Sequence, residues 1–574
     1  MYVEAKKGLS RELWTFHGGL HLPDHKEISL ARPTRQAALP ARLVLPLSQH
    51  IGAPAQPLVA VGQHVLKGEK IADAPAPVTA PLHAPTSGTV IEIADHAIPH
   101  PSGLPGPCIV IEPDGKETWS QLPAPISDWR HTDAAVLRER IRESGVVGMG
   151  GATFPSAVKL NPGKPIKTLI INGAECEPYI TCDDRLMQDA PERIMAGVRI
   201  LQHMLQSEEC LIAIEDNKPE AILALHNLVQ DDEPIEVIRI PTLYPSGGEK
   251  QLIRILTGRE VPSSGLPAQL GVICHNVATA AAIADAVLEG KPLISRLVTL
   301  TGEGIAEPGN FQTLIGTLAG DLIAQAGGYR NQPEQLILGG PMMGFDLTSD
   351  AIPITKGANC LLCPTPEEAP RPEPARACIR CGRCADACPA NLLPQQMYWY
   401  SRAKDLEKVQ DYNLFDCIEC GCCSHVCPSH IPLVQYFRYA KTESWAQEQE
   451  RRDAERAKQR HDARIARIER LEAERKANLR KKKEALDKKP PPKRVADTGA
   501  GSGTGESDKE RKQAAIEAAM KRAAEKKAQQ QAAPKNTDNL TPAQQAKIEA
   551  VEQRRKAAQS PPQKETDNET EQHP

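Results

Sequence analysis

Eight of the 16 cysteines form two copies of a spacing that is typical of iron–sulfur proteins. Each copy reads C-x2-C-x2-C-x3-C-P, first over residues 378–389 and again over residues 417–428. The first three cysteines of such a run bind one [4Fe–4S] cluster, and the fourth usually binds the other. The spacing therefore predicts two cluster sites: Cys378, Cys381, Cys384 and Cys427 in one, and Cys417, Cys420, Cys423 and Cys388 in the other.

The alternatives for these cysteines explain less of the pattern. A structural zinc ion needs four ligands, so it accounts for neither the repeated set nor the proline after each run. In a large intracellular chain, short regular spacing also favours metal over disulfides. Cys422 and the lone C-x-x-C pair, Cys360 and Cys363, are expected to be bystanders. Because paired clusters move single electrons, we expect an electron carrier.

A glycine-rich segment from Gly145 to Lys159 suggests a second kind of chemistry. Glycines let backbone N–H groups approach a phosphate, and a helix start and Lys159 would add positive potential. A tight turn into a helix would need the same glycines, so the segment alone leaves both interpretations open. It does not match the dinucleotide fingerprint, because it precedes the first strand of its region.

Residues 126–292 alternate strands and helices, which predicts a Rossmann-like domain with a mostly parallel sheet. Ligands bind beyond the carboxyl ends of such strands. The polar or glycine-rich segments there are therefore expected to meet at one rim. Strand-length apolar runs lie at 169–171, 211–214, 237–240 and 272–274, helical periodicity at 191–206, 218–230, 246–257 and 277–290, and the rim segments at 172–177, 215–218, 243–249 and 275–276.

The rest of the chain divides into smaller regions. Residues 30–125 resemble the biotinyl/lipoyl carrier fold, a barrel-sandwich hybrid, but the hairpin at 76–83 lacks the lysine of a carrier. Residues 293–350 predict a small β-grasp-like (SLBB) unit, and 366–444 a helical ferredoxin module. Residues 445–574, rich in Ala, Lys and Glu, predict a solvated helix or disorder.

Composition and the N-terminus narrow the class of protein further. A chain of 574 residues needs several cores, and a net charge of −4 gives no sign of nucleic-acid binding. No apolar stretch is long enough to span a membrane, and residues 1–20 lack a secretory signal, so a cytoplasmic protein is expected. In the N-terminal segment 1–29, His17, His21 and His25 are expected to be exposed and not to bind metal.

Four motifs resemble, in order, the flavin-binding motifs of the NADH-oxidising subunit of respiratory complex I. They are the glycine-rich segment, Asn172-Gly-Ala-Glu-Cys-Glu-Pro178, Tyr244-Pro-Ser-Gly-Gly-Glu249 and His275-Asn-Val-Ala-Thr279. With a barrel before them and two ferredoxin motifs after them, the chain resembles the RnfC/RsxC family, which belongs to the Rnf (Rsx) ion-translocating electron-transport complex. The resemblance spans residues 10–440, and the tail resembles proteobacterial members more loosely.

The resemblance implies roles for the matching residues. Four residues would line the FMN phosphate and ribityl chain: Gly148, Gly150, Gly151 and Lys159. Six would surround the flavin: Asn172, Glu175, Tyr244, His275, Asn276 and Thr279. Glu177 and Glu249 would face the nicotinamide nucleotide, and Phe154 would stack on one of its rings. Two positions depart from the complex I pattern, because Met149 replaces an arginine and Ala174 replaces an acidic residue.

The resemblance also implies a function. NADH would pass hydride to FMN, and single electrons would continue through two [4Fe–4S] clusters to membrane-embedded and peripheral subunits, and indirectly to ferredoxin or another low-potential carrier. The transfer would be coupled to Na⁺ or H⁺ translocation, with this chain peripheral at the cytoplasmic face of the bacterial inner membrane. No catalytic side chain is required, because the cofactors supply the chemistry.

Two other functions remain open from the sequence. One is a non-enzymatic relay or docking protein whose α/β region is a degenerate flavin domain; Met149 and Ala174 favour it, and Lys159, Glu177 and Glu249 oppose it. The other is a soluble dehydrogenase component that acts away from the membrane, and only the resemblance disfavours it.

Overall fold

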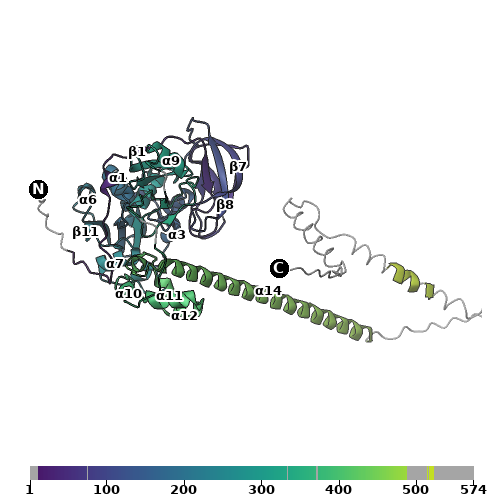
Figure 1. Cartoon of the computed structure of the whole chain (residues 1–574). Helices are drawn as coiled ribbons and strands as arrows, with labels where there is room; N and C mark the ends of the chain where they lie inside the picture. Colours follow the sequence, from purple (N-terminus) through teal and green to yellow (C-terminus); the bar gives the residue numbers. More distant parts are fainter. Residues whose placement is uncertain are drawn as a thin grey trace, which may run out of the picture. The chain divides into compact units, whose positions relative to one another are not determined.

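The structure is a computed structural model that describes residues 11–73, 75–331, 334–369, 373–487, 513–514 and 516–522. It has two compact units, one ending at His461 and the other beginning at Asp462. The first unit holds all the strands and most of the helices described (Figure 1).

The first region is built from two antiparallel sheets, with the strand orders β2-β8-β7-β4 and β3-β5-β6. Their apolar side chains face inward, and Val65, Ile71 and Val90 are fully buried. Gly88 lies where β7 meets β8, and a Cβ there would stand 2.2 Å from the carbonyl oxygen of Glu112. The strands are β2 (Leu43–Pro46), β3 (Gln56–Pro57), β4 (His64–Val65), β5 (Lys70–Asp73), β6 (Leu82–His83), β7 (Gly88–Ala97) and β8 (Pro105–Pro113).

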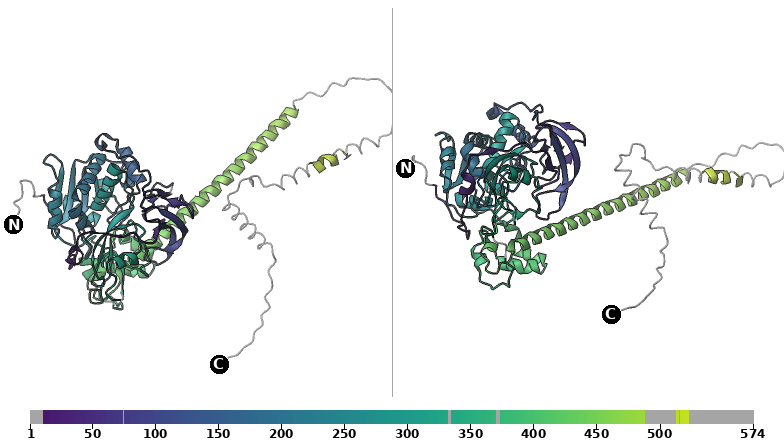
Figure 2. Two further views of the ribbon diagram at one scale, coloured as in Figure 1. Left: turned by 90° about the horizontal axis from the view of Figure 1, so that it is seen from above. Right: turned by 45° about the horizontal axis from the view of Figure 1, so that its top comes forward.

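Four parallel strands in the order β11-β10-β9-β12 form the sheet of the α/β region (Figure 2). The predicted parallel sheet and its helices are confirmed, with boundaries that differ by a few residues at most positions. The strands are β9 (Thr168–Gly173), β10 (Glu209–Glu215), β11 (Ile235–Ile240) and β12 (Val272–Asn276), and the helices are α2 (Ala134–Glu143), α3 (Ser156–Lys159), α4 (Cys182–Asp189), α5 (Pro191–Leu205), α6 (Pro219–His226), α7 (Glu249–Thr257) and α8 (Val277–Ala284), with 3-10 turns at Trp129–His131 and Pro267–Leu270 and a π turn at Asp285–Glu289.

Helices cover both faces of this sheet. Successive side chains of a strand point to opposite faces, so neighbouring residues of β9 pack in different clusters. Ile171 packs in the cluster that contains Val198 of α5, and Ile170 packs in the cluster that contains Leu252 of α7. Helices α5 and α8 approach closely at Gly197, where a Cβ would stand 1.8 Å from the carbonyl oxygen of Ala280. This packing holds the carboxyl ends of the four strands along one rim.

A third region forms a six-stranded mixed sheet in the order β1-β14-β13-β17-β15-β16. Its edge strand β1 comes from before the barrel, so the N-terminal part of the chain is tied to this sheet. Cys360 and Cys363 are buried here, in neither predicted cluster site. The elements are α1 (Glu27–Leu30), β1 (Arg35–Gln36), β13 (Ser295–Thr301), β14 (Gly309–Leu314), α9 (Ala319–Gln325), β15 (Ile337–Leu338), β16 (Phe345–Asp346) and β17 (Cys360–Leu362).

Short helices carry the cysteine motifs around a small core of Met397, Val409, Leu414 and Phe437. They are α10 (Arg383–Asp386), α11 (Pro394–Arg402), α12 (Leu406–Asp411), the 3-10 turn Leu414–Asp416, α13 (Cys422–His425) and the start of α14 (Leu433–Asp487).

The predicted solvated tail is described only in part. Every residue from 449 to 485 in α14 is exposed, as the composition predicts. Residues 488–512 and 523–574 of the predicted tail lie outside the described residues. Within the described part of the chain, no helix has both the length and the apolar character that a membrane crossing requires.

Candidate functional site

Each predicted cysteine set lines one hollow of the helical module. The first cysteine set, Cys378, Cys381, Cys384 and Cys427, lines one hollow, and the second cysteine set, Cys417, Cys420, Cys423 and Cys388, lines another. The fourth cysteine of each motif thus lies with the three cysteines of the other motif. Local backbone geometry is repeated, because Arg380 and Glu419 have φ values of +57° and +58°, and Gly382 and Gly421 have φ values of +84° and +80°.

The chemistry of both hollows fits metal clusters. Burial raises the pKa of Cys417 to about 11, and burial and the neighbouring thiols raise the pKa of Cys423 as well. Four thiols this close cannot all ionise unless a cation compensates them, and a bound metal deprotonates its thiol ligands outright. The donors, their grouping and their surroundings therefore suit [4Fe–4S] clusters.

The glycine-rich segment forms a cradle between α2 and α3. Gly148 N–H donates to the carbonyl of Phe154 at 2.8 Å, and Met149 N–H donates to Thr279 Oγ1 at 2.9 Å. A Cβ on Gly150 would stand 3.2 Å from Asn276 Cβ, whereas a Cβ on Gly151, with φ +105°, would meet open space. The N–H groups of Gly148 and Met149 are thus engaged within the protein, and the open backbone at Gly151 is the part of the cradle that a phosphate can approach, which fits the anionic end of FMN.

The ends of β9 and β12 supply further predicted residues to the rim. Asn172 Nδ2 donates to the carbonyl of Gly247 at 2.8 Å. Asn276 Oδ1 accepts from Ala278 N–H at 2.9 Å and so caps α8, while its Nδ2 donates to Asp183 at 2.6 Å. These two amides fix the loops around the rim.

His275 is buried, and burial lowers the pKa of its imidazole to about 3. Its Nε2 has no hydrogen-bond partner among the described residues. Buried polar atoms usually have a hydrogen-bond partner, so the unpaired Nε2 at the end of β12 fits a site where a ligand supplies that partner.

Lys159 and Glu249 form an ion pair at 2.6 Å between α3 and the start of α7. Both side chains remain 30% or more exposed, so each can still contact a ligand. Phe154 is half-buried and lies just before α3. The structure thus brings Lys159 and Glu249 together, although the resemblance assigned them to different parts of the ligand.

Glu175 is buried just after β9. Its carboxylate is buried and accepts from the backbone N–H groups of Asp183 at 2.8 Å and Asp184 at 3.3 Å, at the start of α4. Burial, together with the charge of Glu175, raises the pKa of Asp183 to about 7. The contacts of Glu175 in this structure are therefore with the protein, and they position α4.

Tyr244 contacts the cysteine module, and Glu177 contacts the loop between β15 and β16. Glu177 Oε1 accepts from the backbone N–H groups of Met342 and Met343 at 2.7 and 3.0 Å, and burial raises the pKa of this carboxyl. The Tyr244 hydroxyl donates to the carbonyl of Cys420 at 2.6 Å. The structure therefore places both residues between the rim and the second cysteine set.

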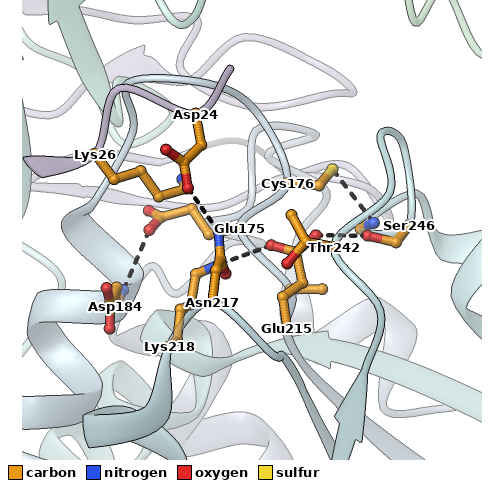
Figure 3. Close-up of polar contacts among 12 residues, drawn as sticks. Asp24, Lys26, Glu175, Cys176, Asp184, Glu215, Asn217, Lys218, Thr242 and Ser246 are labelled. Atoms are coloured by element: carbon orange, nitrogen blue, oxygen red, sulfur yellow. Dashed lines mark hydrogen bonds and ion pairs between the residues drawn. The ribbon is translucent and has the colours of Figure 1, made fainter. Parts of the chain in front are cut away.

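Two of the predicted rim segments, 215–218 and 243–249, join in a buried polar network that was not predicted (Figure 3). Glu215 and Lys218 form a fully buried ion pair at 2.6 Å, and Ser246 Oγ donates to Glu215 at 2.7 Å. Burial opposes the charge of Lys218, but Glu215 and neighbouring acids raise its pKa. The available signal was the pair of opposite charges three residues apart, directly after an apolar strand.

Two of the three N-terminal histidines are exposed, as predicted, and His25 is not. His17 and His21 are exposed, but His17 Nδ1 donates to the carbonyl of Cys388 at 2.9 Å. His25 is half-buried, and its ring stacks on Tyr179 with 4.6 Å between the ring centroids. The described part of this segment, from residue 11 on, is therefore packed against the α/β region and the second cysteine set.

Comparison with known families agrees with this architecture. Four family models match: the RnfC barrel sandwich hybrid domain over residues 14–116, the Nuo51 FMN-binding domain over 141–285, the SLBB domain over 297–346 and a 4Fe-4S dicluster domain over 377–431. These matches confirm the predicted fold class, and they support FMN and [4Fe–4S] clusters as the cofactors.

Curated relatives decide the family. A protein from Pseudomonas aeruginosa, named as the C subunit of an ion-translocating oxidoreductase complex, is 50% identical over 467 residues, which is 81% of this chain and 60% of that protein. A protein of the same name from Yersinia pestis is 48% identical over 460 residues, which is 80% of this chain and 74% of that protein. The chain belongs to the RnfC family of ion-translocating oxidoreductase complexes.

The matched part of this RnfC-family chain covers about three fifths of the Pseudomonas relative's length. Among solved structures, an NAD⁺-reducing [NiFe]-hydrogenase aligns with a TM-score of 0.39 and 19% identity, over 55% of this chain and 65% of that chain.

Proposed function

We propose that this RnfC-family chain exchanges electrons with NAD(H) at FMN and relays them through two [4Fe–4S] clusters, within a membrane-bound complex whose partner subunits couple the transfer to ion translocation. The observation that carries the proposal is the contact between the rim and the second cysteine set, where the Tyr244 hydroxyl reaches the Cys420 carbonyl at 2.6 Å. A hydride acceptor at the rim would thus lie beside an electron acceptor.

When bound, FMN supplies the conversion between a two-electron hydride transfer and single-electron transfers, and [4Fe–4S] clusters hold electrons one at a time. The glycine cradle at 148–151 and Lys159 hold the anionic end of the flavin in this proposal. Asn172, Asn276 and Thr279 fix the loops around it, and His275 Nε2 offers the remaining polar contact.

The rim also carries residues for the nicotinamide nucleotide. Glu249 is half-exposed beside Lys159, so its second oxygen can accept from a ribose hydroxyl. Phe154, half-buried just before α3, keeps its predicted role of stacking on a ring of that nucleotide in this proposal. Glu177 is assigned instead to positioning, because its carboxylate holds the backbone at 342–343 against the rim.

In this proposal the chain is a peripheral protein at the cytoplasmic face of the inner membrane. The names of its relatives support membership of a multi-subunit complex that moves ions. Salt washing of membranes that contain the whole complex tests this placement. We expect the chain to stay with the membrane fraction in a salt-free wash for as long as its partner subunits are present. Its release without salt, in a buffer that leaves the other subunits in the membrane, would contradict it.

An anaerobic NADH titration of the purified full chain, with flavin and iron analysed on the same sample, tests the electron-transfer proposal. We expect bound FMN that bleaches with NADH, followed by loss of cluster absorbance. Clusters without flavin, and no response after FMN is added, would instead establish a relay whose α/β domain only docks partners.

A further inference from the structure

A buried arginine contacts the glycine cradle at 148–151 on its inner side. Arg296 lies in β13, and only 2% of its surface is exposed. Its guanidinium donates to the carbonyl of Lys356 and, at 3.4 Å, to the carbonyl of Met149, the second residue of the cradle. It donates to no carboxylate among the described residues. An arginine side chain keeps its proton in proteins, so a charged donor holds the backbone of the cradle.

This contact fixes the direction of one peptide group. In the described part of the chain the one cis peptide bond is Tyr244–Pro245, so the peptide bond between Met149 and Gly150 is trans. The carbonyl and the N–H of a trans peptide point in opposite directions. Because Arg296 holds the Met149 carbonyl on the inner side, the Gly150 N–H points to the outer side of the cradle.

The outer side of the cradle is open and has free donors. Gly150 and Gly151 are exposed, and a Cβ on Gly151 would meet nothing within 4 Å. The N–H groups of Gly148 and Met149 have acceptors in the protein, whereas those of Gly150 and Gly151 donate to no group among the residues that the structure describes. Free backbone N–H groups in a glycine-rich turn are the donors that bind phosphate.

We propose that Arg296 is a positioning residue for the phosphate of the flavin: by holding the Met149 carbonyl, it aims the Gly150 N–H at the phosphate and strengthens it as a donor. The inference rests on the proposed function and adds the residue that makes the site select a phosphorylated flavin. A charged donor forms a strong hydrogen bond, and hydrogen bonds in a chain polarise one another. The Met149–Gly150 peptide is the middle link of such a chain.

A purely structural role for Arg296 makes a different prediction. Arg296 also joins β13 to the backbone at Lys356, so its loss could loosen the whole site. FMN and riboflavin differ only in the phosphate. A loosened site would weaken the binding of both flavins alike, whereas the loss of a phosphate-positioning contact would weaken FMN alone.

The experiment is a titration of the full chain, freed of flavin and with both clusters retained, with FMN and with riboflavin. Quenching of flavin fluorescence gives the two dissociation constants, and iron analysis of each protein checks the clusters. We expect the wild type to prefer FMN. Arg296→Met should reduce this preference at least about tenfold, with the dissociation constant of riboflavin unchanged within about twofold.

The matched control is Arg140→Met, which makes the same change of side chain and charge. The Arg140 guanidinium also donates to two backbone carbonyls, those of Ala286 at 3.3 Å and Ala124 at 3.0 Å, and neither belongs to the cradle. This variant should keep the wild-type preference for FMN. A loss of preference in the control as large as that in Arg296→Met would overturn the proposal, because it would mean a general effect of charge.

Arg296→Lys keeps the buried charge and serves where the methionine variant does not fold. An ammonium lacks the planar fork that lets a guanidinium donate to two carbonyls at once. We therefore expect this variant also to bind FMN more weakly and riboflavin as the wild type does.

An unchanged ratio of the two dissociation constants in the Arg296 variants would overturn the proposal. So would equal weakening of FMN and riboflavin, which would leave Arg296 a structural tie. A wild type that binds neither flavin would instead contradict the FMN site of the proposed function, so the two failures can be told apart.

Discussion

At the residue scale, one hydroxyl joins the rim of the sheet to the second cysteine set. Tyr244→Phe should lower the free energy of unfolding by about 1–3 kcal/mol, because the buried Cys420 carbonyl loses its donor. Denaturant unfolding of the full chain measures this loss. Tyr329→Phe is the control: its hydroxyl donates at 3.3 Å to an exposed site at Asp350, and we expect a change within about 0.5 kcal/mol. Equal losses of unfolding free energy in both variants would show that the Tyr244 hydrogen bond stabilises the fold no more than the exposed Tyr329 one does.

The cysteine assignment predicts how iron is lost. The full chain purified anaerobically should carry about eight iron atoms, and Cys420→Ser should retain about four, because one cubane loses a ligand. Cys422→Ser is the neighbouring control and should retain about eight. Analysis of the iron content of each purified protein measures these numbers. A full iron complement in Cys420→Ser, or half in Cys422→Ser, would require a different ligand set.

Residue roles could be predicted from the sequence to different extents. The grouping of the cysteines follows from short spacings, so each set could be named before the fold was known. The direction of Glu177 and Tyr244 could not, because it depends on how the backbone at 342–343 and the second motif pack against the rim. No local pattern encodes such packing between distant segments.

At the element scale, the buried pair Glu215–Lys218 ties β10 to α6 and, through Ser246, to the loop that carries Tyr244. Lys218→Met should destabilise the protein by about 3–5 kcal/mol, because Glu215 would be left charged and buried. Adding Glu215→Met should recover much of this loss. Lys167→Met, at an exposed pair with Glu208 3.9 Å away, is the control and should change stability by less than about 1 kcal/mol. If thermal unfolding showed the same stability for Lys218→Met and for this control, the buried pair would not be what holds β10, α6 and the Tyr244 loop together.

Lys356, in the third region, makes hydrogen bonds to the first region and to the α/β region, and its contribution to stability depends on pH. Its Nζ donates to the carbonyls of Pro81 at 2.8 Å and Gly145 at 2.7 Å, and burial lowers its pKa from 10.5 to about 7. Between these two values the unfolded chain holds the proton and the folded chain does not, so stability rises with pH across this window.

Lys356→Met removes this titration. The free energy of unfolding of the wild type, minus that of the variant, should therefore increase from about pH 7 to about pH 10, because the two histidines whose pKa Lys356 lowers, His50 and His83, titrate below this window. Denaturant unfolding over this pH range measures the difference. A difference that stays constant, or falls, would mean that Lys356 is charged in the folded protein.

Regular elements were easier to predict than the segments that cover them. The four parallel strands are apolar runs of strand length, and periodicity predicted their helices. The N-terminal segment has no helical or strand periodicity, so no pattern in it indicated that His17 would lie against Cys388. Its position depends on surfaces that form only when distant parts of the chain fold: Phe16 packs against the α/β region, and Leu20 packs beside Tyr244 and the second cysteine set.

At the scale of the whole molecule, the arrangement orders the two clusters. The second set is covered by the rim, the N-terminal segment and the loop at 340–343, and the first set opens outward, with residues 379–383 exposed. Electrons that enter from NADH should therefore meet the second cluster before the first.

The most direct test of this order is rapid-freeze EPR of NADH-reduced full chains that each lack one cluster. In Cys381→Ser the remaining second cluster should be reduced as fast as in the wild type, whereas in Cys420→Ser the remaining first cluster should be reduced far more slowly, although dithionite reduces it fully. The reverse pattern, or equal rates in both variants, would contradict entry through the second cysteine set.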